Sequence, residues 1–205
     1  MSRGEQHKLC DVTSYNKTLG GYLMHKALPV LILGVVAVAI MARPKVSSTM
    51  ATPEYNSDGA LIRPKDFAQW TFVGASIGLS YSENARNDGG PGTFHNVQIQ
   101  PEAYQEYKKT GKFPEKTMLV LTLHAPEQKV SPNQHGYFEG KLVAQEVAVK
   151  DKEHFPEGWA YFDFGGGANV RETAKAQAKD RCFACHVKHG QDDNVFVQFY
   201  PALRK

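Results

Sequence analysis

The chain contains the pentapeptide Cys182-Phe183-Ala184-Cys185-His186, which has the C-x-x-C-H spacing of a c-type haem attachment motif. Two thiols at this spacing can add to the vinyl groups of haem as thioethers, and the adjacent imidazole can bind the iron as its proximal ligand. The motif therefore predicts one haem c, bound covalently through Cys182 and Cys185, with His186 on the iron.

Three other uses of a C-x-x-C pair were weighed against haem attachment. A zinc ribbon needs a second pair of Cys or His ligands, and the only other cysteine is Cys10. A thioredoxin-type redox pair begins a helix after a strand, whereas the Ala-, Lys- and Gln-rich segment 170–180 predicts a helix that leads into the motif. A disulfide between Cys182 and Cys185 would close a very small loop. Haem attachment is favoured over all three.

The residues outside the motif bear on the second axial position of the iron. Only nineteen residues follow His186, and none of them is methionine. Met118 lies on a predicted strand, where core packing explains it, and His189 is explained as a solvated neighbour of the motif. An iron without a second protein ligand is therefore expected, and an open haem site binds small molecules.

Composition places the chain among ordinary globular proteins. It has 205 residues, of which 41% are hydrophobic and 22% charged, so disorder is excluded as the main state. The net charge of +3 comes from scattered Lys and Arg, which argues against a nucleic-acid partner. Three cysteines are too few for a disulfide scaffold. Eleven Phe, nine Tyr and two Trp could fill a core or enclose a large flat cofactor.

The N-terminal part carries an uncharged apolar run at residues 27–42. This run is shorter than the ~20 residues that usually span a bilayer, and it is typical of a secretory signal peptide. Read from Met24, the chain has the usual signal-peptide layout, so we expect the biological start there and an upstream extension before it. Cleavage after Ala39, Ala42 or Ala51 stays open. The alternative is an uncleaved membrane anchor, and both interpretations place the domain in the periplasm.

Three parts are expected along the chain: the extension with its signal peptide or anchor at 1–42, a linker at 43–66, and a haem-binding domain at 67–205. Alternating apolar residues and turn signals predict a β-rich α+β domain. The five predicted strands argue against the four-helix bundle of the cytochromes c′, whose chains are helical throughout. Strands are predicted at 70–77, 95–100, 117–123, 137–150 and 158–164, and helices at 101–109 and 170–180.

Four separated blocks in this order, residues 94–113, the WAYFDF stretch at 159–164, the C-x-x-C-H motif and residues 195–201, resemble the cytochrome P-460 family. The family includes the non-cross-linked cytochromes c′-β, and the similarity extends over about 70–204. The resemblance implies a β-rich fold with a few helices, a homodimer, and one pentacoordinate haem c. It also implies a small nitrogen-oxide ligand: P-460 members oxidise hydroxylamine, whereas c′-β members bind nitric oxide.

The chain departs from the P-460 pattern at Leu121. Family members with a haem cross-link carry a lysine on this strand, and leucine has no nitrogen that could form the bond. Lys116 precedes the strand and Lys129 follows it, so neither fits without a shift in register. The sequence thus favours a nitric-oxide-binding cytochrome, with a hydroxylamine-oxidising enzyme as the alternative. A plain electron carrier would need a sixth ligand that the sequence does not offer.

The resemblance also assigns two polar residues to the distal side of the haem. His95 corresponds to the family's distal arginine, and Glu146 to its acidic residue, so either could hydrogen-bond a ligand or move its protons. Without the resemblance, a surface histidine in a loop and a glutamate on the solvated strand face are the favoured explanation; with it, the two interpretations stand about equal. A redox partner protein is expected as well. The candidates for an apolar distal wall, which core packing would also explain, are Leu121, Phe72, Phe94 and Phe113.

Overall fold

The computed structural model describes residues 49–80, 90–132 and 134–205, which belong to a compact unit spanning residues 46–205. The expected signal segment at 1–42 and the expected start at Met24 lie outside the described residues. Within the described part of the chain, no helix has the length and apolar character needed to cross a membrane.

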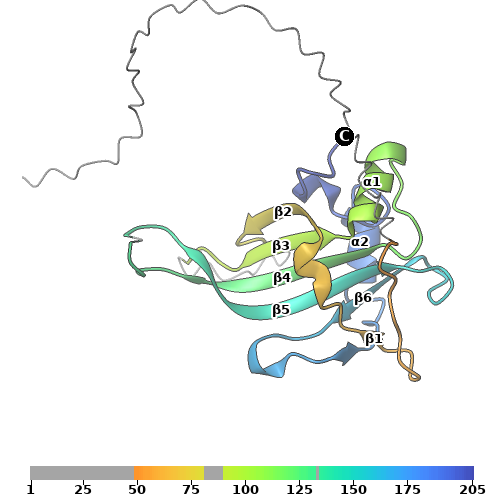
Figure 1. Cartoon of the computed structure of the whole chain (residues 1–205), viewed down its shortest axis with the longest axis horizontal. Coiled ribbons are helices and arrows are strands. Elements are labelled where there is room, and N and C mark those ends of the chain that lie inside the picture. The colour runs from red at the N-terminus through yellow and green to blue at the C-terminus, as the bar shows by residue number, and fades with distance from the viewer. Residues whose placement is uncertain (1–48, 81–89, 133) are drawn as a thin grey trace, which may run out of the picture. The chain divides into compact units, whose positions relative to one another are not determined.

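The domain is built on an antiparallel sheet with the strand order β2-β3-β4-β5-β6, so each strand pairs with its neighbour in sequence (Figure 1). Alternating residues and short apolar or aromatic runs predicted all five strands, and the β-rich α+β fold is confirmed. A second pairing joins β1 (Leu61–Ile62) to β7 (Thr173–Ala174). The sheet strands are β2 (Thr71–Ile77), β3 (Phe94–Ile99), β4 (Met118–Glu127), β5 (Phe138–Lys150) and β6 (Trp159–Asp163).

Two α-helices accompany the sheet. The predicted helix α1 (Pro101–Thr110) has proline in its first turn, and Gly111 ends it in the left-handed conformation at φ 73°. The second helix, α2 (Phe183–His189), carries the second cysteine and the histidine of the motif. Short 3-10 helices are η1 (Asp66–Gln69), η2 (Gly167–Asn169) and η3 (Val197–Phe199).

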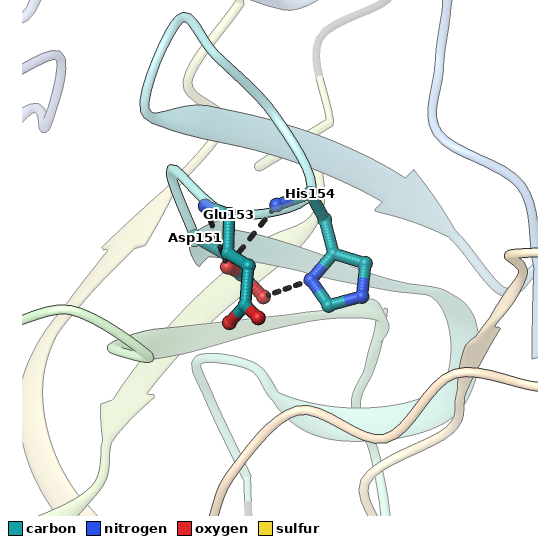
Figure 2. A group of neighbouring side chains, drawn as sticks. All are labelled: Asp151, Glu153 and His154. Carbon is teal, nitrogen blue, oxygen red and sulfur yellow. Dashed lines mark hydrogen bonds and ion pairs between the residues drawn. The ribbon is translucent and has the colours of Figure 1, made fainter.

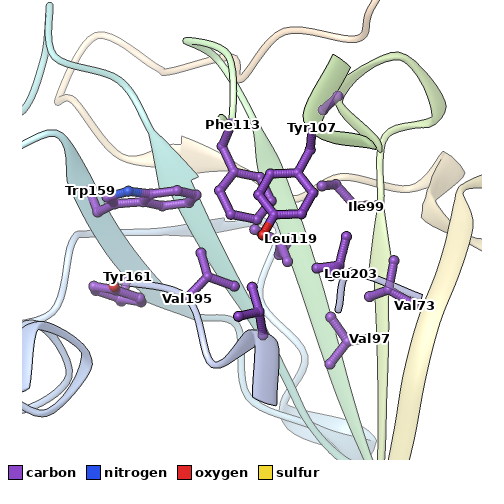
Figure 3. Packing of buried hydrophobic residues seen from close by; sticks show 12 residues of the cluster. Val73, Val97, Ile99, Tyr107, Phe113, Leu119, Trp159, Tyr161, Val195 and Leu203 are labelled. Carbon is purple, nitrogen blue, oxygen red and sulfur yellow. The ribbon is translucent and has the colours of Figure 1, made fainter. Parts of the chain in front are cut away.

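The sheet buries both of its faces in separate apolar clusters, because successive side chains of a strand point to opposite faces. On β4, Leu119 joins the cluster shown in Figure 3, while Met118 and Val120 join the cluster on the other face. In the first cluster, Tyr107 of α1 stacks on Phe113 with ring centroids 4.1 Å apart. Cys182 and Phe183 pack against this same cluster, so the start of α2 lies over that face of the sheet.

Two sequence predictions differ from the structure. Segment 170–180 was predicted as a helix, but it contains β7, an isolated bridge from Ala176 to Phe162 and a hydrogen bond from Gln177 N to Tyr161 O of 2.8 Å. Pairing with β1 and β6 outweighs the high helix propensity of Ala and Lys, because tertiary pairing routinely overrides local propensity. The segment at 43–66, predicted as a linker, contributes β1, whose Leu61 is fully buried.

Beyond the sheet, a buried carboxylate organises the turn that joins β5 to β6 (Figure 2). Asp151 accepts hydrogen bonds from Lys116 Nζ at 2.6 Å, His154 Nδ1 at 2.9 Å and the Tyr55 hydroxyl at 3.2 Å. Burial alone would raise the pKa of Asp151, but the hydrogen bond from Lys116 and the nearby positive charges hold it below its ordinary value. The Lys116 ammonium also contacts Glu153 at 2.9 Å, so the two acids share one cation.

We expect Asp151→Asn to lower the free energy of unfolding by about 1–3 kcal/mol, because the buried partner of Lys116 loses its charge. A carboxylate with a lowered folded pKa stabilises the fold above its unfolded pKa and loses that effect as the pH falls through the folded pKa. The difference between wild type and variant should therefore shrink in acid. Denaturant unfolding at several pH values measures this, with Glu153→Gln as the exposed control. Equal effects of the two substitutions would contradict the assignment.

Candidate haem-binding site

The motif cysteines lie within one turn at the beginning of α2. Cys182 is the residue before the helix, Cys185 lies inside it, and both thiols are free and partly buried. Residues three apart share one side of a helix, so both thiols can reach the edge of one flat group. The helix expected at 170–180, before the motif, is absent. The sequence argument that a helix leads into the motif therefore no longer excludes a thioredoxin-type pair.

The electrostatics of Cys182 bear on that alternative. A reactive redox thiol has a lowered pKa. Burial raises the pKa of Cys182, the Glu146 carboxylate adds to the increase, and Arg181 opposes it. A thiol that holds its proton is a poor nucleophile for disulfide exchange, so the local environment disfavours the redox pair.

The imidazole of His186 is held in one orientation by three contacts. Its Nδ1 donates a hydrogen bond of 2.8 Å to the Asn194 carbonyl. The ring packs between Tyr161 and Phe196, with centroid distances of 4.1 and 4.3 Å. Burial lowers the pKa of His186, and the hydrogen bond to Asn194 opposes that effect. A neutral imidazole with its proton on Nδ1 presents the lone pair of Nε2, the form that binds iron.

A cavity of about 110 Å³ lies between this helix and the sheet, and both Cys182 and His186 line it. The opposite wall comes from three paired strands, because Leu121 of β4 pairs with Glu146 of β5, which pairs with Asp163 of β6. The structure thus brings the motif together with Leu121 and Glu146, two residues singled out by sequence. The remaining lining residues are Val147, Ala148, Tyr161, Phe162, Gln177 and Arg181.

Glu146 is one of two carboxylic acids in the sheet wall, the other being Asp163. Burial raises its pKa above the ordinary value, the neighbouring Asp163 carboxylate raises it further, and Arg181 opposes the rise. A carboxyl group in such a place can hold a proton at a pH where a solvated glutamate has lost it. It is therefore suited to give a proton to a bound molecule or take one from it.

His95 lies on the same sheet face as Leu121 but does not line the cavity. It pairs with Leu123 of β4, and residues two apart on a strand share a face. Its side chain is buried, with Nε2 2.9 Å from the Thr93 hydroxyl. Burial lowers the pKa of His95, which favours the neutral imidazole.

The three candidate phenylalanines of the distal wall lie elsewhere. Phe72 is 53% exposed and pairs with Gln98, whereas Phe94 pairs with His124, so both point away from the face that carries Leu121. A β-bulge after Phe72 causes its change of face, which the sequence pattern does not reveal. Phe113 is buried in the cluster of Figure 3, in edge contact with Trp159 at 5.9 Å.

Sequence reasoning missed three residues of the site. Tyr161 lies within the aromatic stretch of β6, where its side chain was not distinguished from core. Arg181 immediately precedes Cys182 and lines the cavity. Asn194 acts through its backbone carbonyl, so its side chain carried no signal, although the Asp192-Asp193-Asn194 run is typical of a turn.

The donor set fits a haem c. Two free thiols and an imidazole with one available nitrogen lie at and within the start of α2, and Cys182 and His186 face a largely apolar wall. Cofactor pockets usually measure about 300–1,000 Å³. The cavity of about 110 Å³ is smaller, so haem attachment would have to widen it or extend beyond its rim.

No curated protein matches the chain significantly. The family model for cytochrome P460 matches residues 64–197, which covers both the sheet and the C-x-x-C-H helix. Membership of this family implies that the chain binds haem c. By this match, and in agreement with its fold and site, the chain belongs to the cytochrome P460 family.

Proposed function

We propose that the chain is an exported mono-haem c-type cytochrome whose open iron site binds small nitrogen oxides such as nitric oxide. Cys182 and Cys185 form the thioether bonds, and His186 is the proximal ligand. The observation that supports binding over cross-linked oxidation chemistry is Leu121 in the cavity wall. Among the described residues, no lysine lines this cavity.

The haem, when bound, supplies a redox-active iron that can coordinate a small nitrogen oxide. The chain supplies the surroundings. His186 offers a fixed neutral nitrogen, and Leu121 presents a hydrocarbon surface that disfavours water. Glu146, whose pKa is raised, supplies a carboxyl group at the polar edge of the same wall.

The absence of a methionine ligand in the cavity supports the open iron site. Met118 is buried in the cluster on the opposite face of the sheet from Leu121, so its sulfur is directed away. His189 is exposed on α2 and does not line the cavity. His186 is the one histidine among the described lining residues. An electron carrier with two strong protein ligands is therefore disfavoured.

Hydroxylamine oxidation is the second candidate function, and Glu146 is the observation in its favour. Oxidation of hydroxylamine releases protons, and a carboxyl group with a raised pKa near the cavity could accept them. Leu121 weighs against this candidate because the cross-link found in hydroxylamine-oxidising members needs an amine.

The location and the partners belong to the same proposal. Export rests on the apolar run at 27–42 and on the periplasmic attachment of haem in bacteria. The homodimer and the redox partner protein rest on the family resemblance.

We expect Cys182→Ala and Cys185→Ala each to impair haem attachment, because each removes one thioether sulfur. The double variant should give no haem-stained band on a denaturing gel. His186→Ala should keep the haem attached but change its electronic spectrum, because only the iron ligand is lost. Purified wild-type protein that contains zinc and no haem would refute the haem assignment.

We expect Glu146→Gln to raise the thermal stability at neutral pH. A carboxyl with a raised folded pKa costs stability as the pH rises from its unfolded value through the folded value, and glutamine does not ionise. Wild type and variant should thus converge near pH 4 and separate toward pH 7, roughly the range above the ordinary glutamate pKa. Thermal unfolding across this range tests it, with Glu106→Gln at an exposed position of α1 as control. A variant less stable than wild type at neutral pH would contradict the raised pKa.

We expect the wild-type ferrous protein to show the spectrum of an ordinary thioether-bound haem, without the red shift of the cross-linked family. It should bind nitric oxide and turn hydroxylamine over poorly. Leu121→Lys would place an amine at this wall, where burial favours the neutral, nucleophilic form. Peroxide, by accepting two electrons, could then allow a nitrogen–carbon bond to the porphyrin, detected by mass on the haem peptide.

Leu121→Met, of similar size but without an amine, is the matched control for that experiment. The wild-type measurement decides the question, because the lysine variant also needs suitable geometry. Brisk hydroxylamine oxidation by the wild type, or a third covalent haem bond, would show that another lysine forms the cross-link to the porphyrin and that the proposal is wrong.

A further inference from the structure

The carbonyl group that receives His186 Nδ1 belongs to an unusual turn. Asp193 and Asn194 adopt left-handed conformations in succession, at φ 47° and 60°. Such angles are uncommon outside glycine, although Asp and Asn tolerate them best. Hydrogen bonds between Asp192 and Val195 close the turn, from Val195 N at 2.8 Å and from Asp192 N at 3.3 Å. A turn of this kind needs further contacts to keep one conformation.

The Asp193 carboxylate provides those contacts with the sheet. It accepts hydrogen bonds from Lys150 Nζ at 2.7 Å and from Trp159 Nε1 at 3.2 Å. Lys150 ends β5 and Trp159 begins β6, and the two residues are paired across the strands. The Lys150 side chain is 12% exposed and also donates to the Phe113 carbonyl at 2.8 Å. The turn is therefore attached to a rigid edge of the sheet.

The opposite side of the turn packs against the end of α2. A Cβ atom on Gly190 would lie 2.6 Å from the Asn194 carbonyl carbon, so the close approach requires glycine. The Asn194 carbonyl accepts from His186 Nδ1 at 2.8 Å and from the Tyr161 hydroxyl at 3.3 Å. The position of this oxygen thus depends on where the turn is held.

We propose that Asp193 is a positioning residue for the proximal histidine. Its carboxylate fixes the turn that directs the Asn194 carbonyl at His186 Nδ1. A carbonyl acceptor keeps the proton on Nδ1 and makes Nε2 a stronger donor to iron. A stronger donor stabilises ferric over ferrous iron, so Asp193 lowers the reduction potential of the haem. The inference rests on haem ligation by His186 in the proposed function.

The deciding variant is Asp193→Gly in the haem-loaded protein. Glycine accepts the φ of 47° without strain, so the substitution removes the carboxylate and keeps the backbone conformation accessible. We expect the iron–histidine stretching band of the ferrous protein to move to lower frequency in the resonance Raman spectrum. The reduction potential should rise, and haem attachment should be unchanged.

Two further variants separate positioning from a general effect of charge or stability. Asp193→Asn keeps an oxygen for Trp159 and tolerates the left-handed conformation, so it should restore most of the wild-type frequency and potential. Glu172→Gln removes one exposed acid paired with Arg63 and Lys65, and should leave both readouts unchanged.

The inference would be overturned if Asp193→Gly kept the iron–histidine frequency and the reduction potential of the wild type. It would also be overturned if Glu172→Gln shifted both quantities as much as Asp193→Gly does. If Asp193→Gly does not fold, Lys150→Met removes the main partner of the same carboxylate and is judged by the same two readouts. Wild-type protein without haem would instead contradict the proposed function, so the two failures are distinguishable.

Discussion

The hydrogen bond from His186 Nδ1 to the Asn194 carbonyl is the constraint on which the rest of the site depends. An imidazole packed between Tyr161 and Phe196 needs a partner for its buried N–H, because an unsatisfied donor costs free energy. Meeting that need at Nδ1 leaves Nε2 as the available nitrogen. It also fixes the rotation of the ring between Tyr161 and Phe196.

The sheet supplies the opposite wall by the same alternation that builds its two cores. Leu119 is buried in the cluster shared with α1, and Leu121, two residues further along β4, lines the cavity. Glu146, its partner on β5, brings a carboxyl group into a largely apolar wall. Glu146 is exposed as a residue, but partial loss of hydration at its carboxyl group and the neighbouring Asp163 carboxylate raise its pKa, while Arg181 opposes the rise. The same face of the sheet therefore forms part of the core at Leu119 and lines the cavity at Leu121.

Much of this arrangement could be predicted from local pattern. The strands follow from alternation, α1 from Pro101 and Gly111, and the haem donors from spacing alone. The failures share one physical cause, which is long-range pairing. Segment 170–180 has helix-forming residues, yet its backbone pairs with β1 and β6, and Leu61 of the expected linker is buried by the same pairing. The Asn194 carbonyl was beyond prediction because a backbone group has no residue type to recognise.

Family membership specifies the cofactor class but not the reaction, because one fold can carry several chemistries. The reaction must follow from the side chains at the cavity. An amine at the position of Leu121 would be a nucleophile, whereas leucine offers only contact with a ligand or a porphyrin edge. Glu146 can exchange a proton in either case, so it does not discriminate between binding and oxidation. The proposal of reversible ligand binding therefore depends on Leu121, because its hydrocarbon side chain can contact a ligand or a porphyrin edge but cannot form a bond to it.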